Sequence, residues 1–444
     1  MMESVTVVGA GLAGCEAAFQ AAKRGVRVDL YEMKPKKMTP AHHSEGFAEL
    51  VCSNSLRSAA LTNAVGLLKE EMRLLGSLIM EAADKCRVEA GSALAVDRAA
   101  FSDYITNKIR SNPLITVHEE EITSLPDVPI CIIASGPLTS DSLAQSIREY
   151  LDVKSLSFYD AAAPIVDAST IDYSKAFFAS RYGKGEPTSY LNCPMTKEQY
   201  EVFYNALISA EEAPLKEFDA ESQKDLTVFE GCMPVEVMAK RGEDTLRFGP
   251  MKPVGLPVPD TGKDAYATVQ LRKENEQGTM YNLVGFQTHL TFPEQKRVFS
   301  LIPGLENASF LRYGVMHRNT FLDSPKLLNC NYSLRKDPRY FFAGQMTGVE
   351  GYVESASSGL LCGIFAALRV LGKDAPDFPS ATAIGSLAHY VATGTQSKFE
   401  PMNVNFGIID PLEKKVKGGK LKKNEALAER ALAIIKEIVS SGNI

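Results

Sequence analysis

The sequence has no tryptophan, and its eight cysteines show neither a CxxC pair nor a Cys/His spacing suited to zinc. The absence of such spacings argues against a structural metal site and against a disulfide framework. We therefore expect no metal ligands and reduced thiols. A chain of 444 residues with 45% hydrophobic residues is long enough to bury a large core without such cross-links.

Segments that direct proteins to membranes are also missing. The N-terminus has no charged region followed by an apolar core and a small-residue cleavage site. No stretch approaches the ~18 apolar residues that a membrane span needs. The net charge of −6 argues against a protein that coats nucleic acid over its whole surface, although it does not exclude local basic patches. We expect a cytoplasmic protein with no membrane contact.

A glycine-rich loop stands between a strand and a helix near the N-terminus. The β-branched residues 5–8 are followed at once by Gly9-Ala10-Gly11-Leu12-Ala13-Gly14. A helix over about 15–24 and a strand over 26–33 complete a βαβ unit. In this context GxGxxG predicts a dinucleotide site, because the glycines let the backbone approach a pyrophosphate at a helix N-terminus. Glu32, at the end of the second strand, is predicted to accept hydrogen bonds from ribose hydroxyls; the alternative is a purely structural turn.

The later return of the chain to this sheet favours FAD over NAD. Residues 128–134 form an apolar strand that ends in Ser135-Gly136, and residues 339–371 form a short strand, a glycine-rich turn and an apolar helix. This layout resembles the glutathione-reductase-like FAD proteins, many of which carry an acid where this sequence has Gln345. No second GxGxxG is present, so we expect no Rossmann-type NAD(P)H domain. The cofactor contacts predicted at these segments are Gly136, Gly344, Gln345, Gly348, Gly351 and Tyr352.

The residue pattern of the chain changes between about 155 and 325, where short β-rich segments alternate with glycine and proline. We predict an α/β protein with a discontinuous Rossmann-type FAD domain over 1–155 and 320–444. An α+β substrate domain is inserted over 156–319, and the substrate site is expected where the two domains meet. Other expected elements are helices over 62–85, interrupted near Gly76, over 97–112 and over 424–441, and a Lys/Gly linker over 410–423.

Two cysteines stand in polar, turn-like surroundings. These are Cys52, in Val51-Cys52-Ser53-Asn54, and Cys232, in Gly231-Cys232-Met233-Pro234. Such contexts permit exposure and nearby donors, which activate a thiol. Cys15, Cys86, Cys131 and Cys362 lie in apolar helices or strands, where a small buried hydrophobe is the ordinary interpretation.

Several longer motifs point to one family. The segments are 9–18, 38–42, 51–56, 61–72, 136–140, 190–195, 248–256, 313–320 and 348–352, and the resemblance as a whole runs from residue 4 to about 410. Together they resemble the methylenetetrahydrofolate–tRNA (uracil-5-)-methyltransferases of the FADH₂-oxidising type, called TrmFO. The related GidA-type tRNA-modifying flavoproteins share the FAD loops, but their longer C-terminal helical region is not seen here.

The resemblance implies a specific reaction. In that family 5,10-methylenetetrahydrofolate gives its one-carbon unit to reduced FAD, and the flavin passes it to carbon 5 of a T-loop uridine, position 54, which forms ribothymidine. NAD(P)H supplies the reducing equivalents, and FAD is the bound cofactor. By resemblance Cys232 is the nucleophile at C6 of the uracil and Cys52 is the base at C5, although the roles within the pair stay interchangeable. A thiolate suits the addition because it is strongly nucleophilic and leaves cleanly afterwards.

Further candidates for substrate contact are weaker. Lys252 brings one cation to a Pro-braced loop, and Phe286, His289 or Phe292 could stack on a pterin. His317 and Arg318 could contact the folate glutamate tail or an RNA phosphate. The basic run Lys414, Lys415, Lys417, Lys420, Lys422 and Lys423 is either a solvated linker or a phosphate contact.

The sequence leaves three rival functions open. The same chemistry could act on a uridine of 23S ribosomal RNA instead of tRNA. A non-methylating flavin oxidoreductase would show activity without RNA or folate. An RNA-binding flavoprotein with a structural FAD would keep its function after substitution of Cys232.

Overall fold

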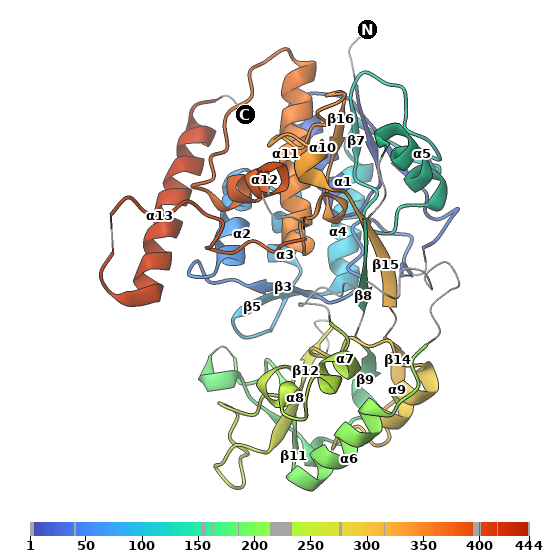
Figure 1. The fold of residues 1–444 in the computed structure, drawn as a ribbon, viewed down its shortest axis with the longest axis vertical. Helices are drawn as coiled ribbons and strands as arrows, with labels where there is room; N and C mark the ends of the chain where they lie inside the picture. Colours follow the sequence, from blue (N-terminus) through green and yellow to red (C-terminus); the bar gives the residue numbers. More distant parts are fainter. Residues whose placement is uncertain are drawn as a thin grey trace.

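The computed structural model describes two lobes joined by a narrow waist (Figure 1). The described residues are 4–39, 41–152, 156–161, 163–184, 186–213, 233–274, 278–314, 316–393, 399, 401–414 and 416–442. For 156–161 and 316–320 only the backbone is described.

The first lobe is built around a parallel sheet in the order β16-β7-β1-β2-β6. Its strands are β1 (Val5–Val8), β2 (Val28–Glu32), β6 (Ile115–Glu119), β7 (Cys131–Ile133) and β16 (Tyr340–Phe342). The first, second and late strands predicted for a nucleotide-binding sheet are therefore neighbours in one sheet. This arrangement confirms the predicted Rossmann-type α/β fold.

Two helices pack closely against each other beside this sheet. They are α1 (Leu12–Lys23) and α11 (Tyr352–Val370). A side chain at Gly359 would place its Cβ 2.1 Å from the carbonyl oxygen of Ala13, so the contact requires glycine. The sequence predicted a start for α1 near Cys15, but the helix begins at Leu12, because Gly11 already serves as its N-cap.

The remaining elements of this lobe surround that pair. Helices α2 (Ala64–Leu74) and α3 (Leu78–Lys85) are separated at Gly76, as predicted, where φ is +73°. The others are α4 (Arg98–Arg110), α5 (Asp141–Leu151), α10 (Ser324–Leu327) and α12 (Ala383–Thr393), with the small sheet of β3 (Ser55–Ser58), β4 (Arg87–Val88) and β5 (Ala93–Val96).

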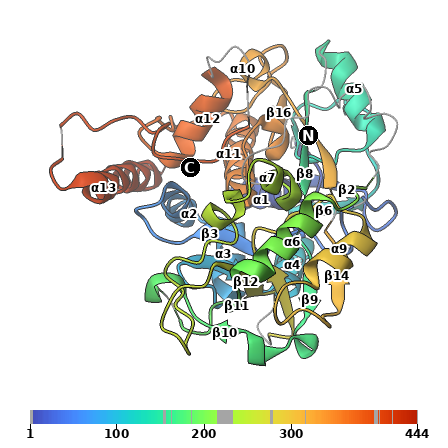
Figure 2. The same cartoon turned by 60° about the horizontal axis from the view of Figure 1, so that its bottom comes forward.

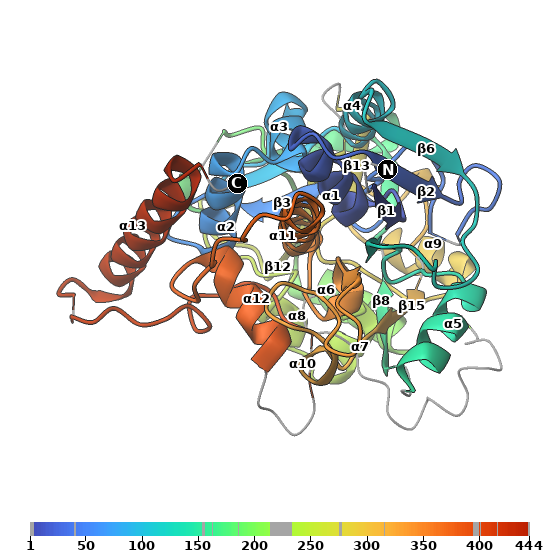
Figure 3. The ribbon, with the colours of Figure 1, turned by 90° about the horizontal axis from the view of Figure 1, so that it is seen from above.

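The C-terminal helix α13 (Gly419–Ser440) lies at the outer edge of the lobe beside α2 (Figures 2 and 3). The predicted linker over 410–423 is therefore wrong in its last part, because Lys420, Lys422 and Lys423 lie on the helix. Lysine is a good helix former, and Leu427 and Ile435 bury one face of α13, so the helix extends back through the basic run.

Helix α11 differs from the expectation that no segment reaches membrane-spanning length. Among the described helices it is long and apolar enough to cross a membrane by length and composition. Most of it is buried inside the protein, where it packs against α1 and β16. Its hydrophobicity is therefore that of a core helix.

The second lobe has its own sheet and its own hydrophobic cluster. The sheet is antiparallel in the order β10-β11-β12-β13-β9-β14. Its strands are β9 (Ile165–Asp167), β10 (Phe177–Phe178), β11 (Leu191–Met195), β12 (Ala267–Lys273), β13 (Met280–Leu283) and β14 (Phe310–Arg312); its helices are α6 (Lys197–Ile208), α7 (Val235–Lys240), α8 (Thr245–Phe248) and α9 (Phe292–Phe299).

The waist consists of two antiparallel strands, β8 (Leu156–Ala161) and β15 (Met316–Phe321), which carry the chain out to the second lobe and back (Figure 1). The domain limits 1–155, 156–319 and 320–444 stay a prediction, but the two largest hydrophobic clusters lie on either side of this waist.

Candidate functional site

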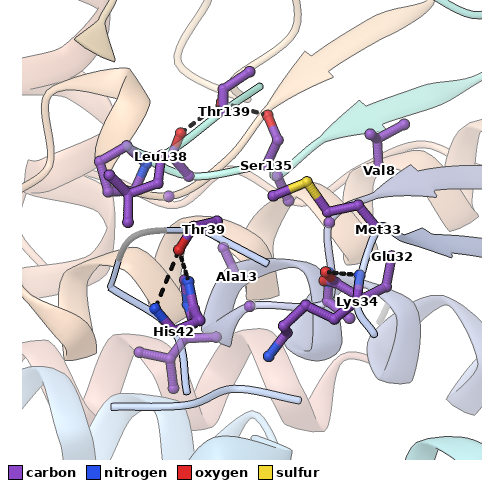
Figure 4. A pocket seen from close by; sticks show the side chains of 18 of the residues that line it. Val8, Ala13, Glu32, Met33, Lys34, Thr39, His42, Ser135, Leu138 and Thr139 are labelled. Atoms are coloured by element: carbon purple, nitrogen blue, oxygen red, sulfur yellow. Dashed lines mark hydrogen bonds between the residues drawn. The ribbon is translucent and has the colours of Figure 1, made fainter. Parts of the chain in front are cut away.

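A pocket opens at the carboxyl ends of β1, β2 and β7, the edge of a parallel sheet where ligands bind in such folds (Figure 4). Most of the residues predicted to hold the cofactor line this one pocket. They are Gly9, Ala10, Gly11, Leu12, Ala13, Glu32, Gly136, Gly344, Gln345 and Tyr352. Gly14, Gly348 and Gly351 do not line it.

The space around each glycine of the loop shows why a side chain is or is not tolerated there. Gly9 has φ +101°, and a Cβ there would lie 2.6 Å from the carbonyl oxygen of Ala134. A Cβ on Gly14 would lie 1.7 Å from the oxygen of Gly9, so this glycine serves the turn itself. At Gly11 a Cβ would meet no protein atom within 4 Å. The space beside Gly11 is therefore open to the pocket.

The N-terminus of α1 has no side-chain cap among the described residues. Its N-cap Gly11 makes no side-chain hydrogen bond, and its first turn contains no acidic residue. The amide groups and the positive dipole end of this helix therefore suit an anionic group in the pocket.

Glu32 ends β2 with both carboxylate oxygens engaged by backbone amides. One oxygen accepts a hydrogen bond from Ala10 N at 2.8 Å, and the other accepts one from Lys34 N at 3.0 Å. The Lys34 ammonium is buried and donates to the carbonyl oxygens of Ser44, at 3.1 Å, and Gly46. Lys34 also lines the pocket, although no sequence motif predicted a site role for it.

Thr39 and His42 form a second polar corner that the sequence analysis did not assign to the site (Figure 4). The Thr39 hydroxyl lies 2.6 Å from His42 Nδ1 and accepts a hydrogen bond from His42 N. Both belong to the 38–42 motif, which carried the family resemblance but no distinct chemical signal. On the opposite wall the Ser135 and Thr139 hydroxyls are 2.7 Å apart.

The glycine-rich turn before α11 forms the far wall. Gly344 N donates to Ser358 Oγ at 2.7 Å, and the Gln345 amide donates to both oxygens of Glu350, at 3.0 and 2.9 Å. An acid is thus present beside Gln345 after all, five residues later in the sequence. Gly348 and Gly351 are required by the turn, with φ values of +84° and +113°.

Cys52 lies half-buried at the edge of this site, with its backbone fixed by Tyr352. The Tyr352 hydroxyl oxygen accepts hydrogen bonds from Cys52 N at 2.6 Å and Ser53 N at 3.2 Å. Burial raises the pKa of the Tyr352 phenol, and the nearby Cys52 acts in the same direction. The preceding residue, Val51, lines the pocket directly.

Cys232, the second predicted catalytic residue, lies outside the described residues. The chain is described again from Met233, and α7 follows in the second lobe. There Val235 N donates to Gln287 O at 2.7 Å, and buried Glu236 accepts hydrogen bonds from His289 N and Thr288 Oγ1 at 2.7 and 2.9 Å.

The weaker substrate candidates do not line the pocket. Lys252 lies in the loop after α8, where its carbonyl oxygen accepts from Arg181 at 2.8 Å. Phe292 is 51% exposed and stacks on Tyr313, with ring centroids 4.9 Å apart. His317 and Arg318 lie on β15, and their side chains are outside the described part.

The prediction that Phe286 or His289 stacks on a pterin is corrected by the burial of these two side chains. Phe286 is fully buried and packs against Phe203 and Phe299, so its ring is not available to a pterin. His289 is nearly buried, and burial lowers its pKa.

The cysteines predicted to be small buried hydrophobes behave in that way. Cys15, Cys131 and Cys362 are fully buried, and burial raises the pKa of each thiol. Cys86 is only partly buried, and burial raises its pKa as well.

Comparison with known proteins places the chain among its relatives. The family model described as Glucose inhibited division protein A matches residues 4–374. The chain is 61% identical over 440 residues to the methylenetetrahydrofolate–tRNA-(uracil-5-)-methyltransferase TrmFO of Acetivibrio thermocellus, covering 99% of each chain. It is 60% identical over 438 residues, with the same coverage, to the protein of the same name from Listeria monocytogenes serotype 4b.

A solved structure shares the fold at much lower identity. The structure of Aquifex aeolicus GidA in its form II crystal matches with a TM-score of 0.69 and 18% identity, covering 99% of this chain and 74% of that chain. By model match and by full-length identity, the chain belongs to the Glucose inhibited division protein A family and is a TrmFO-type member of it.

Proposed function

We propose that this protein is a folate- and FAD-dependent methyltransferase that converts a uridine of tRNA to 5-methyluridine. The target is the T-loop uridine at position 54, the methylene group comes from 5,10-methylenetetrahydrofolate, and NAD(P)H supplies the electrons. The names of the relatives at about 60% identity give methylenetetrahydrofolate, tRNA and methyl transfer to carbon 5 of uracil. The observation on which the proposal rests is the hydrogen bond from the backbone nitrogen of Cys52 to the hydroxyl oxygen of Tyr352, a residue of the pocket wall.

The residues of the pocket fit FAD. The uncapped N-terminus of α1 and the open space at Gly11 suit the pyrophosphate. Glu32, which ends β2, suits the ribose. Gly136, Gly344, Gln345 and Tyr352 would hold the rest of the cofactor, with Gly14, Gly348 and Gly351 shaping the backbone. When bound in reduced form, FAD carries and reduces the one-carbon unit.

The protein side of the reaction needs two thiols. Uracil C5 becomes nucleophilic only after a nucleophile has added to C6, and the Cys232 thiolate provides that addition in our proposal. C5 then forms a bond to the one-carbon unit, which bound flavin would supply. The Cys52 thiolate accepts the proton that C5 loses, and expulsion of the Cys232 thiolate from C6 restores the C5–C6 double bond. The hydrogen bonds from Cys52 N and Ser53 N to Tyr352 hold the base at the rim of the pocket.

Substrate contacts outside the pocket are assigned to the second lobe and the waist. Lys252, Phe292, His317 and Arg318 are proposed to contact folate or RNA. The division into an FAD domain over 1–155 and 320–444 and a substrate domain over 156–319 follows the same logic, with the reaction at their junction. We propose the cytoplasm as the location, where unmodified tRNA, folate and NAD(P)H are available.

The test is reconstitution with purified components. Protein with bound flavin is incubated with 5,10-methylenetetrahydrofolate carrying a labelled methylene carbon, NADPH and unmodified tRNA, and nucleosides are analysed by mass spectrometry. Labelled 5-methyluridine is expected, with loss of product but retention of FAD in Cys52→Ala and Cys232→Ala. Cys330→Ala serves as the matched control, because Cys330 is also partly buried, but neither it nor its chain neighbours line the pocket, whereas Val51, next to Cys52, does.

The rival functions give different results in the same experiment. Product on a 23S ribosomal RNA fragment, but none on tRNA, would favour the ribosomal target. NADPH oxidation that ignores both folate and RNA would favour an oxidoreductase. Unchanged function in Cys232→Ala would favour an RNA-binding flavoprotein with a structural cofactor.

A further inference from the structure

Three arginines from distant parts of the sequence hold the segment that carries Cys52. Arg98 begins α4, Arg272 lies on β12 and Arg312 ends β14. Their hydrogen bonds run from Arg98 Nη1 to Leu50 O (2.9 Å), from Arg312 Nη2 to Val51 O (2.7 Å), from Arg272 Nη2 to Ser53 Oγ (2.7 Å) and from Arg272 Nε to Asn54 Oδ1 (2.9 Å). Arg272 and Arg312 of the second lobe, together with Arg98 of the first, thus bind the Cys52 segment. Tyr352 accepts hydrogen bonds from the same segment.

Positive charge exceeds negative charge around this segment. Arg98 forms an ion pair with Glu274 at 2.6 Å, and Arg57 forms one with Glu354. For Arg312 the described residues supply no ion pair, and its buried Nε has no hydrogen-bond partner among them. Arg312 is therefore a largely buried cation that forms no direct ion pair within the described part of the chain. The carboxylate that acts on it, Glu274, is paired directly with Arg98.

The other charged groups nearby do not change this balance. Arg272 bonds to the neutral side chains of Ser53 and Asn54. The buried Lys69 ammonium donates to Leu56 O at 2.6 Å and to Arg57 O at 3.2 Å. Arg272 adds positive charge, whereas Lys69 adds it only below its lowered pKa of about 7. Without Lys69, the four arginines at positions 57, 98, 272 and 312 still outnumber Glu274 and Glu354 around the segment.

Arg312 and Cys52 are close enough to interact electrostatically. Burial, and after it the charge of Arg98, lowers the pKa of Arg312. Glu274, Tyr352 and Cys52 oppose this effect. Keeping a guanidinium buried without a directly paired carboxylate costs free energy, and perturbed charged groups of this kind cluster at functional sites.

We infer that Arg312 is a positioning residue of the methylation site, which fixes the Val51–Cys52 peptide and places a positive charge beside the Cys52 thiol. The inference rests on the proposed function, in which Cys52 acts as a base. A thiol accepts a proton only as the thiolate, and a nearby cation favours that charged form. Because Arg312 belongs to β14, the second lobe supplies the charge that activates a residue of the first.

The test measures the reactivity of the Cys52 thiol itself and not methyl transfer. FAD-loaded protein, without folate or RNA, is treated with iodoacetamide at pH 7.5, and modification of Cys52 is followed by peptide mass spectrometry. Arg312→Gln is expected to slow this modification about tenfold, the effect of one nearby charge on a thiolate. Arg312→Lys, which keeps the charge, is expected to react within about threefold of the unsubstituted protein.

The matched control is Arg24→Gln. Arg24 also donates to a backbone oxygen, Gln20 O at 2.8 Å, and has a buried Nε without a described partner, but it lies at the far end of α1 from the pocket. Its rate should equal that of the unsubstituted protein. Modification of Cys52 in Arg312→Gln at an equal or faster rate would overturn the inference, since simple loosening of the segment also accelerates alkylation.

A second variant keeps the inference testable if Arg312→Gln does not fold. Glu274→Gln removes the carboxylate that faces Arg98 and opposes the charge of Arg312, so Cys52 modification is expected to accelerate severalfold. An unchanged or slower rate would count against the inference. Because no step needs RNA or folate, a negative result here is separate from failure to form 5-methyluridine.

Discussion

The hydroxyl oxygen of Tyr352 lies 2.6 Å from the backbone nitrogen of Cys52, although 300 residues separate them in the chain. Tyr352 opens α11 and lines the pocket, so the same side chain borders the proposed flavin site and holds the proposed base. The position of Cys52 is consequently coupled to the wall of the pocket.

Replacement of Tyr352 by phenylalanine tests this coupling. Tyr352→Phe leaves the amides of Cys52 and Ser53 without their acceptor, which is expected to cost about 1–3 kcal/mol in the free energy of unfolding. Product formation should fall while FAD remains bound. Urea unfolding and the labelled-methylene assay give the two values.

The control for this substitution is Tyr340→Phe, which removes a hydrogen bond to Pro126 O at 3.0 Å but lies away from Cys52. It should retain methylation. Equal activity losses in both variants would contradict a specific role for the Tyr352–Cys52 contact.

Two glycines of the same loop should respond differently to alanine. In Gly14→Ala the new Cβ meets the oxygen of Gly9 at 1.7 Å, so the turn must shift and we expect a loss of about 1–3 kcal/mol in stability. In Gly11→Ala the Cβ enters open space, so folding should be normal while FAD occupancy falls. Thermal unfolding and the flavin-to-protein absorbance ratio separate the two effects; full flavin content in Gly11→Ala would speak against the proposed site.

The buried Lys69 predicts a pH-dependent stability. Burial, with a further contribution from Arg57, lowers its pKa to about 7 from an ordinary value of 10.5. Between these values the unfolded chain binds a proton that the folded protein does not, so the contribution of Lys69 to stability rises with pH from about 7 upward.

Urea unfolding at pH 7, 8 and 9 measures this effect against Lys69→Met. The difference in stability between the two proteins should change by at most about 1.4 kcal/mol per pH unit in favour of the protein with lysine. Lys85→Met, at an exposed position, should follow the unsubstituted protein. Parallel curves for Lys69→Met and the unsubstituted protein would refute the assignment.

The basic start of α13 is expected to contribute to RNA affinity. Replacing Lys420, Lys422 and Lys423 by glutamine removes three charges from the first turns of this helix. If all three contact phosphates, the slope of log affinity against log salt should flatten by about 2. Filter binding of tRNA across a salt titration measures the slope, and an identical slope in the variant would remove this run from the RNA interface.

Local sequence by itself determined the nucleotide-binding unit. The strand at 5–8, the glycine loop and the terminal Glu32 are contiguous, and each feature follows from short-range steric requirements, such as the 1.7 Å approach of a Gly14 Cβ to Gly9. The family motifs likewise singled out Cys52, whose surroundings were polar in the sequence as well. The helix break at Gly76 was readable for the same local reason.

Tertiary structure alone decided which distant groups surround Cys52. Arg312 reaches Val51 across 261 residues, and Tyr352 reaches Cys52 across 300, because a two-stranded waist returns the second lobe to the first. No short-range pattern marks Arg312, since an arginine on a strand has the same local sequence context whether it faces water or the carbonyl oxygen of a distant residue. Burial of Phe286 excluded it as a pterin contact, which its sequence context could not show. Packing of Leu427 and Ile435 extended α13 into a run of lysines whose composition is typical of a linker. Contacts between segments far apart in the chain depend on how the layers close around the core, and this is a property of the whole fold.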